Sequence, residues 1–234
     1  MDVPAGQEAP APRFYGRRSS RPLRPGRKVA VGIRLPDRML TLPAAGGPLD
    51  PAGLFDGPVA EVWLEIGFGS GEHLLGRAEA HPDVGFIGCE PWIDGTAALL
   101  ARASAALLPR LRVLPDDARP LLPVLADGSI ARLFVLFPDP WPKRRHHRRR
   151  LIQPAMLREA VRILRPGGEL LFASDHAGYV RWTLALATAE PGLRWCARRP
   201  QDWRTPPPGW IATRYQQKAQ ARGERCTFLR FRRV

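Results

Sequence analysis

Apolar runs recur along the chain at the lengths and intervals typical of buried strands. They lie at Val62–Ile66, Val84–Cys89, Leu111–Leu114, Leu133–Phe137 and Leu170–Ala173. Stretches of helical character separate them, and the clearest are Ile93–Leu107 and Ala155–Leu164, the second of which follows Pro154 and precedes Pro166. Strands that are apolar on both faces and alternate with helices are typical of a parallel sheet covered on both sides. The pattern therefore predicts an α/β fold.

The two ends of the chain depart from this pattern. Residues 1 to about 55 are rich in Pro, Gly and Arg and show little periodicity, which predicts a basic, mostly irregular arm over 1–55. A single domain is then expected over 56–234, since 234 residues suit one α/β domain with an arm. Near the end, Arg225–Arg233 alternates basic and apolar residues, as a half-buried edge or antiparallel strand does.

The charge of the chain narrows the class of partner. Lys+Arg total 36 against 22 Asp+Glu, a formal net charge of +14, and nearly all the bases are arginine. Such a composition also arises from GC-rich codon usage, but the resulting potential still attracts phosphate, so a polyanion such as a nucleic acid is the expected partner. The charge is uneven: nine acids and one base, Arg77, lie between Asp50 and Asp94, whereas eleven bases and two acids follow from Arg194 onward.

Other features of the composition exclude several classes. No apolar run reaches the roughly 18 residues of a membrane span, and Met1–Pro10 lacks the layout of a secretory signal. Cys89, Cys196 and Cys226 are odd in number and far apart, so they indicate neither a disulfide framework nor a zinc site. We therefore expect a cytoplasmic protein without a membrane partner, and nothing in the sequence implies an obligate protein partner.

A glycine-rich turn follows the first predicted strand. Gly67, Gly69 and Gly71 lie in the segment LEIGFGSG, where glycine permits positive φ and the close approach of a ligand to the backbone. The dinucleotide fingerprint would need glycine at position 72, where this chain has Glu72, and a negative helix start repels a pyrophosphate. Glu65, just before the turn, suits an ammonium or sulfonium better than a phosphate.

Acids also follow the next two strands. Glu90 ends the second strand, where a carboxylate can take both hydroxyls of a ribose, and Asp116-Asp117 follow the third, placed to receive an adenine amino group. Because the carboxyl ends of parallel strands meet at one edge, these acids are expected to surround one adenosyl ligand. S-adenosylmethionine is cationic at its sulfur and amino group, so it fits such a pocket.

The fourth strand ends in a proline-framed acid and a basic run, FPDPWPKRRHHRRR. Three prolines in five residues hold Asp139 and Trp141 on a stiff loop, as a catalytic position requires. Six bases between Lys143 and Arg150 suit several phosphates at once. The adjacent His146 and His147 lack metal-ligand spacing on a helix, so no metal is proposed.

Two further segments carry candidate residues. Asp175-His176 ends the fifth strand, at the same predicted edge, whereas the nearby Trp182 is better explained as core. Thr213-Arg214-Tyr215-Gln216, in the basic last third of the chain, offers a hydroxyl, an aromatic ring and an amide, which is suitable chemistry for a purine.

Together these segments resemble the bacterial tRNA (guanine-N7-)-methyltransferase family. The likeness covers Glu61–Val234, and its most specific element is the run from Phe137 to Arg150; LEIGFGSG, LRPGGELLFASD and TRYQ agree in order and spacing. The chain departs from the family in having His176 where Trp is frequent and Gln216 in place of Glu. An amide cannot accept from both N1–H and the amino group of guanine, as a carboxylate does.

The resemblance implies a Rossmann-like class I fold, a mostly parallel seven-stranded sheet with an antiparallel final strand. It implies methyl transfer from S-adenosylmethionine to N7 of a tRNA guanine, at position 46 of the variable loop. It further implies that Asp139 is the catalytic residue and that the cofactor contacts Glu65, Glu90, Asp117, Asp139 and the glycine turn. The tRNA guanosine would contact Lys143, Asp175, Thr213, Arg214, Tyr215 and Gln216.

Two other interpretations stay open at the sequence level. Asp139 and Trp141 loosely resemble the Asp-Pro-Pro-aromatic loop of amino-group methylases, although the order of residues differs. A non-catalytic RNA-binding module on a Rossmann-like core is the other alternative, against which the full set of acids speaks. The identity of the methylated nucleoside would distinguish an amino-group methylase from an N7-methyltransferase. Failure to bind S-adenosylmethionine would favour the RNA-binding module.

Overall fold

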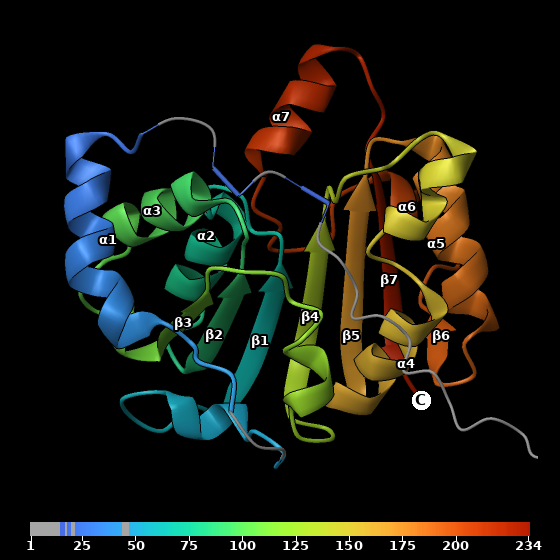
Figure 1. Ribbon diagram of the computed structural model, residues 1–234. Helices are drawn as coiled ribbons and strands as arrows, with labels where there is room; N and C mark the ends of the chain where they lie inside the picture. The colour runs from blue at the N-terminus through green and yellow to red at the C-terminus, as the bar shows by residue number, and fades with distance from the viewer. Residues whose placement is uncertain (1–14, 17, 20–21, 44–46) are drawn as a thin grey trace, which may run out of the picture.

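The computed structural model describes residues 15–16, 18–19, 22–43 and 47–234 (Figure 1). Within them, one seven-stranded sheet has the order β3-β2-β1-β4-β5-β7-β6. All neighbouring strands are parallel except β7, which runs antiparallel to both β5 and β6. This confirms the predicted α/β fold with its antiparallel final strand. The strands are β1 Glu61–Ile66, β2 Val84–Cys89, β3 Leu111–Leu114, β4 Ile130–Leu136, β5 Leu164–Ser174, β6 Leu193–Trp195 and β7 Thr227–Arg233.

Helices pack on both faces of the sheet (Figure 1). The helix expected over Ile93–Leu107 ends at Arg102, and the one expected over Ala155–Leu164 begins one residue earlier, at Pro154. The α-helices are α1 Pro25–Arg38, α2 Glu72–Ala80, α3 Ile93–Arg102, α4 Pro154–Ile163, α5 Ala177–Ala189, α6 Gln201–Arg204 and α7 Arg214–Ala221. Short 3₁₀ turns are η1 Pro51–Leu54, η2 Leu108–Arg110, η3 Leu122–Val124 and η4 Arg144–Arg149. None of the helices described is long and apolar enough to cross a membrane.

Side chains that alternate along each strand divide the core into two layers. On one face, Leu64 and Leu133 pack with α4 and α5. On the other, Trp63, Phe86 and Phe134 pack with α2 and α3. Both layers are apolar over the central strands, which explains why those strands read as continuous apolar runs in the sequence.

The segment before the first strand is more ordered than its composition predicts. Residues 25–38 form α1, where the sequence pattern predicted mostly irregular chain. The Arg34 guanidinium donates to the carbonyls of Leu100 and Ala103 at 2.6 and 2.8 Å, which ties α1 to α3. Leu40, just beyond the helix, is buried in the core. The division of the chain at residue 55 stays a prediction, and residues 1–14 of the expected arm lie outside the described part.

Candidate active site

A cavity of about 600 Å³ opens at the carboxyl ends of β1, β2 and β4. From β1 the sheet grows first toward β2 and β3 and then, on the other side, toward β4 and β5. The point where the strand order reverses is the crevice in which ligands bind in open α/β sheets. Five of the predicted site residues line this cavity: Gly67, Glu90, Asp117, Asp139 and Tyr215. The structure therefore brings together residues from five separate segments of the chain.

The glycine turn borders the cavity, and its backbone conformation requires glycine. Gly67, Gly69 and Gly71 have φ of +76°, +58° and +81°, values that side-chain-bearing residues rarely adopt. A Cβ on Gly71 would also lie 2.4 Å from Leu99 Cδ1. Gly95 of α3 was not singled out in the sequence, yet a Cβ there would lie 2.2 Å from the Gly69 carbonyl oxygen. Four glycines thus set the path of this turn.

Backbone amides hold the Glu90 carboxylate in place. Its two oxygens accept hydrogen bonds from the amides of Gly69 and Trp92, at 2.8 and 2.9 Å. Burial raises the pKa of Glu90, and the nearby Asp139 and Glu65 carboxylates raise it further, while the two amide bonds act in the opposite direction. The Glu90 carboxylate is therefore held in a fixed direction at a place where its negative charge is disfavoured, which suits it to a cationic or hydroxyl-bearing ligand.

Asp117 follows the neighbouring strand β3 and is partly neutralised. One oxygen pairs with the Arg119 guanidinium at 2.9 Å, and the other accepts from the Arg119 amide at 3.1 Å. Both residues line the cavity. The neighbouring Asp116 pairs instead with Arg18, at 2.7 Å.

Glu65 lies below the cavity floor and does not line the cavity. Its side chain is buried, and one carboxylate oxygen lies 2.7 Å from Nδ1 of the buried His73 in α2. Trp210 packs its ring 5.0 Å from that histidine. The prediction that Glu65 contacts the cofactor stays untested, but the structure gives the carboxylate a protein partner that the sequence did not suggest.

Unusual backbone geometry flanks Asp139. Phe137 and Trp141 have φ of +52° and +42°, although neither is glycine, and such conformations persist only where surrounding contacts impose them. The Phe137 amide donates to the Ala173 carbonyl at 2.8 Å, and the Arg150 guanidinium donates to the Pro140 carbonyl at 2.9 Å. Asp139 itself opens to the cavity and to solvent, while partial desolvation raises the pKa of its carboxyl.

The basic run divides into an outer and an inner part. Arg150 is buried, and its guanidinium stacks over the rings of Tyr179 and Trp182. Arg149 stacks over Trp141 at 5.0 Å and over Tyr15 at 4.8 Å. Arg150 therefore supports the loop from inside, and the predicted phosphate contacts of the run would come from its other bases. The exposed members are Lys143, Arg144, Arg145 and Arg148.

The tetrad at the start of α7 also divides in two. Thr213 caps the helix by accepting from the Gln216 amide at 3.1 Å, and Gln216 is buried with its side-chain oxygen 2.6 Å from the Trp210 indole nitrogen that donates to it. Arg214 and Tyr215 are exposed, and the Tyr215 ring lies over Gly69 at the cavity. Only two of the four side chains are therefore available to a ligand in this conformation.

Asp175 and His176 at the end of β5 have partners within the protein. Asp175 pairs with Arg222 at 3.2 Å, and the His176 ring caps α5 by accepting from the Tyr179 amide at 3.1 Å. Capping needs a small acceptor near the backbone, which a tryptophan in this position could not provide. Over the described residues, no three His, Cys, Asp or Glu side chains gather as ligands for a metal ion.

The strand order, the glycine turn and the acids at the strand ends define a class I methyltransferase. Solved structures agree on the fold: an antibiotic-related methyltransferase has a TM-score of 0.55 at 15% identity, over 82% of this chain and 97% of that one. The 16S rRNA methyltransferase KamB has a TM-score of 0.53 at 18% identity, over 75% and 89%.

The chain belongs to the bacterial tRNA (guanine-N7-)-methyltransferase family. A protein of that name from Rhodospirillum rubrum is 52% identical over 94% of this chain and 88% of its own length. Another from Nitrobacter hamburgensis is 48% identical over 94% and 86%. A family model described as a putative methyltransferase also matches residues 59–229. The resemblance found in the sequence motifs is confirmed.

Proposed function

We propose that this protein transfers the methyl group of S-adenosylmethionine to N7 of a guanine in tRNA, with position 46 of the variable loop as the target. The observation that carries the proposal is the cavity, which is lined by acids and by a strained loop that presents Asp139. Relatives of the chain are named tRNA (guanine-N(7)-)-methyltransferase. We place the reaction and its tRNA partner in the cytoplasm.

The cavity fits the proposed cofactor in size and charge. Glu90, with both oxygens already oriented by backbone amides, would accept the ribose hydroxyls, and Asp117 would lie near the adenine. Gly67 leaves room for the amino-acid part to approach the backbone. When bound, S-adenosylmethionine supplies an electrophilic methyl group on a positively charged sulfur.

The reaction needs alignment more than proton transfer. Guanine N7 carries no proton and its lone pair lies in the ring plane, so no base has to create the nucleophile. Holding N7 in line with the methyl group can supply several kcal/mol of the barrier. The purine becomes cationic as the bond forms, so a carboxylate at Asp139 stabilises charge that exists only late in the reaction. The fixed loop of Phe137 to Trp141 keeps that carboxylate oriented.

Exposed residues around the cavity mouth would receive the RNA. The Tyr215 ring offers a stacking surface beside Gly69, and exposed bases offer charge to the phosphates around the target guanine: Lys143, Arg144, Arg145, Arg148 and Arg214. Thr213 and Gln216 would contribute indirectly, by holding α7 and Trp210 in position. Asp175 reaches a guanosine only if it leaves Arg222.

The test is incubation of the purified protein with S-adenosylmethionine and an unmodified tRNA transcript, followed by nucleoside digestion and mass spectrometry. We expect 7-methylguanosine, and its loss from a matched transcript in which guanine 46 is replaced by adenine. A methylated amino group instead would identify an amino-group methylase. No methylation despite tRNA binding would leave a non-catalytic RNA-binding module.

A further inference from the structure

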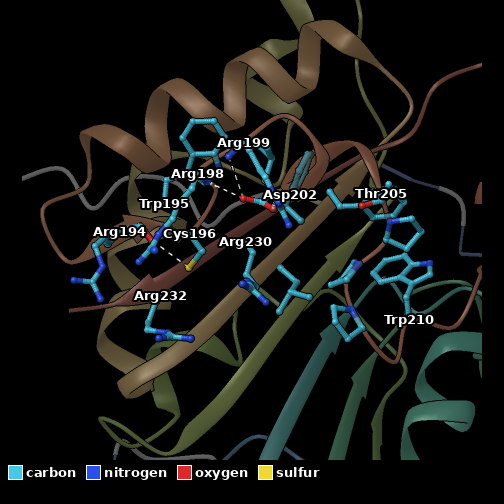
Figure 2. Close-up of a pocket in the computed structure, with 17 residues that line it drawn as sticks. Arg194, Trp195, Cys196, Arg198, Arg199, Asp202, Thr205, Trp210, Arg230 and Arg232 are labelled. Carbon is cyan, nitrogen blue, oxygen red and sulfur yellow. Dashed lines mark hydrogen bonds and ion pairs between the residues drawn. The ribbon is translucent and has the colours of Figure 1, made fainter.

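A second, larger cavity lies away from the proposed active site. It measures about 870 Å³ and lies between the sheet face of β5, β7 and β6 and the segment that contains α6 (Figure 2). We call it the arginine groove. Figure 2 shows Arg230 and Arg232 on the sheet and Arg198 and Arg199 on the facing segment. With Arg194, five arginines line the groove against one acid, Asp202.

The groove exists because the helices cover this sheet face unevenly. On the side of α2 and α3, the strands β1 and β2 carry Trp63 and Phe86, which those helices bury. Farther along the same side, β5 and β7 present Glu169, Arg230 and Arg232 instead. A sheet face that is charged and accessible to solvent is suited to a polar partner rather than to packing.

Strand register places like charges beside one another on this face. Arg132 of β4, Glu169 of β5, Arg232 of β7 and Arg194 of β6 are successive cross-strand partners. This row across four strands therefore contains three arginines and one acid. Arg194 and Arg232 lie directly opposite each other, and like charges in this arrangement destabilise a sheet. An anion between them would remove that repulsion.

Asp202, which lines the groove, and Glu169 of β5, which lies beside it, both have partners within the protein. Glu169 lies 3.0 Å from Arg232 and 3.9 Å from Arg230. Asp202 accepts hydrogen bonds from the backbone amides of Arg198 and Arg199, at 2.8 and 3.1 Å, and this lowers the pKa of its carboxyl. Asp202 thus shapes the loop that presents the two arginines and also pairs with Arg199 at 3.5 Å, so it offsets one of the five positive charges of the groove.

One end of the groove is continuous with the proposed RNA-binding edge. Trp210 lines the groove and donates its indole N–H to Gln216 of α7. Along β7, Phe228 lies near the end of β5 that carries Ser174, whereas Arg232 lies at the far end, opposite Glu169. A long polyanion seated on α7 can therefore continue across Trp210 into the groove.

We propose that the arginine groove binds the phosphodiester backbone of tRNA, away from the methylated guanine. The proposal rests on the proposed function for the identity of the RNA. Planar guanidinium groups match phosphate oxygens in pairs, and several of them along a groove suit a chain of phosphates. An acidic protein or a second copy of this chain are the competing occupants, and the net charge of +14 opposes the latter.

The test compares two double variants of equal charge. Arg194→Gln/Arg198→Gln removes two exposed charges from the groove, and Arg158→Gln/Arg181→Gln removes two exposed charges from α4 and α5 on the opposite face. Affinity for an unmodified tRNA transcript is measured at several salt concentrations, together with sedimentation velocity and the melting temperature. The methylation assay on the wild-type protein is run separately.

We expect the groove variant to bind tRNA about tenfold more weakly at 0.15 M salt, with a salt slope lower by roughly 1.4 to 1.8. Its melting temperature should be unchanged or raised, since Arg194 no longer opposes Arg232. The control should retain the wild-type affinity and slope. Equal binding by both variants overturns the proposal, and so does a change confined to the oligomeric state. Absence of 7-methylguanosine with an intact groove effect would instead contradict only the proposed function.

Discussion

The acidic cavity and the arginine groove use charge in opposite ways. In the cavity, Glu90 is held by two backbone amides, and the glycine turn leaves no room for a Cβ at Gly71. In the groove, the arginines are long and are spread over two strands, β6 and β7, and a loop, and all but Arg230 are exposed at the surface. A small ligand must be gripped at fixed atoms, whereas a polyanion can be held by many interchangeable contacts. Single substitutions should therefore have large effects in the cavity and small ones in the groove.

The strongest test of this comparison is Asp139→Asn. The change keeps the shape of the side chain and removes the charge that would stabilise the cationic purine, so we expect turnover to fall by roughly a hundredfold. Single-turnover formation of 7-methylguanosine at saturating tRNA measures it. Asp83→Asn, an exposed acid before β2, is the matched control. Near-normal turnover with intact tRNA binding would remove Asp139 from the chemistry.

Glu90→Gln should chiefly affect the cofactor. We expect affinity for S-adenosylmethionine to fall by roughly 10- to 100-fold, because hydrogen bonds to a charged group contribute about 1.5–3 kcal/mol. The stability of the unliganded protein should change little, because removal of a charge that burial and two neighbouring carboxylates disfavour is offset by the loss of one acceptor for the Gly69 and Trp92 amides. Calorimetric titration and thermal unfolding measure the two effects. Unchanged cofactor affinity would contradict the assignment of Glu90.

Gln216→Leu examines the connection between the two regions. The substitution leaves the half-buried Trp210 indole N–H without its acceptor, so the free energy of unfolding should fall by about 1 kcal/mol. Trp210→Phe removes the donor, and the double variant should be less destabilised than the sum of the two single ones. Strict additivity would show that the hydrogen bond does not hold α7 and the groove together.

The smallest expected effect is a pH dependence of cofactor affinity. Burial raises the pKa of Glu90 above its ordinary value of 4.5, and desolvation raises that of Asp139 above 3.8. A carboxyl with a raised pKa takes up a proton at a higher pH than an ordinary carboxyl. The protonated carboxyl is neutral, whereas a cationic ligand binds best to the ionised carboxylate. Affinity for S-adenosylmethionine should therefore fall as pH drops toward those raised pKa values, before ordinary carboxylates titrate. Glu90→Gln should make the affinity for S-adenosylmethionine less dependent on pH. The same pH dependence in this variant would show that Glu90 is not its cause.

Most of the fold, and the meeting of several predicted site residues at one cavity, can be predicted from the sequence. Five strands are visible as apolar runs, and the meeting of parallel strand ends is enough to bring Glu90, Asp117 and Asp139 around one cavity. The position of Glu65 could have been anticipated from alternation, because it shares the α2 face of β1 with Trp63. That face leads to His73 instead of the cavity.

Other features depend on contacts between distant residues. Helix α1 forms in a segment of poor helix formers because Arg34 and Arg38 bond to carbonyls of other elements, and tertiary contacts of this kind override propensity. The burial of Gln216 depends on where Trp210 lies. The arginine groove depends on strand register, since only the pairing of β6 with β7 places Arg194 opposite Arg232. Sequence periodicity contains none of this information.

The left-handed backbone of Trp141 has a consequence for how this loop can evolve. Glycine would adopt a φ of +42° without strain, so selection for stability alone would favour it there. Glycine would also remove the indole from the cavity wall and from beneath the Arg149 guanidinium. At position 141 a more relaxed backbone and the present shape of the cavity therefore exclude each other, because the residue that would remove the strain would also remove part of the cavity wall.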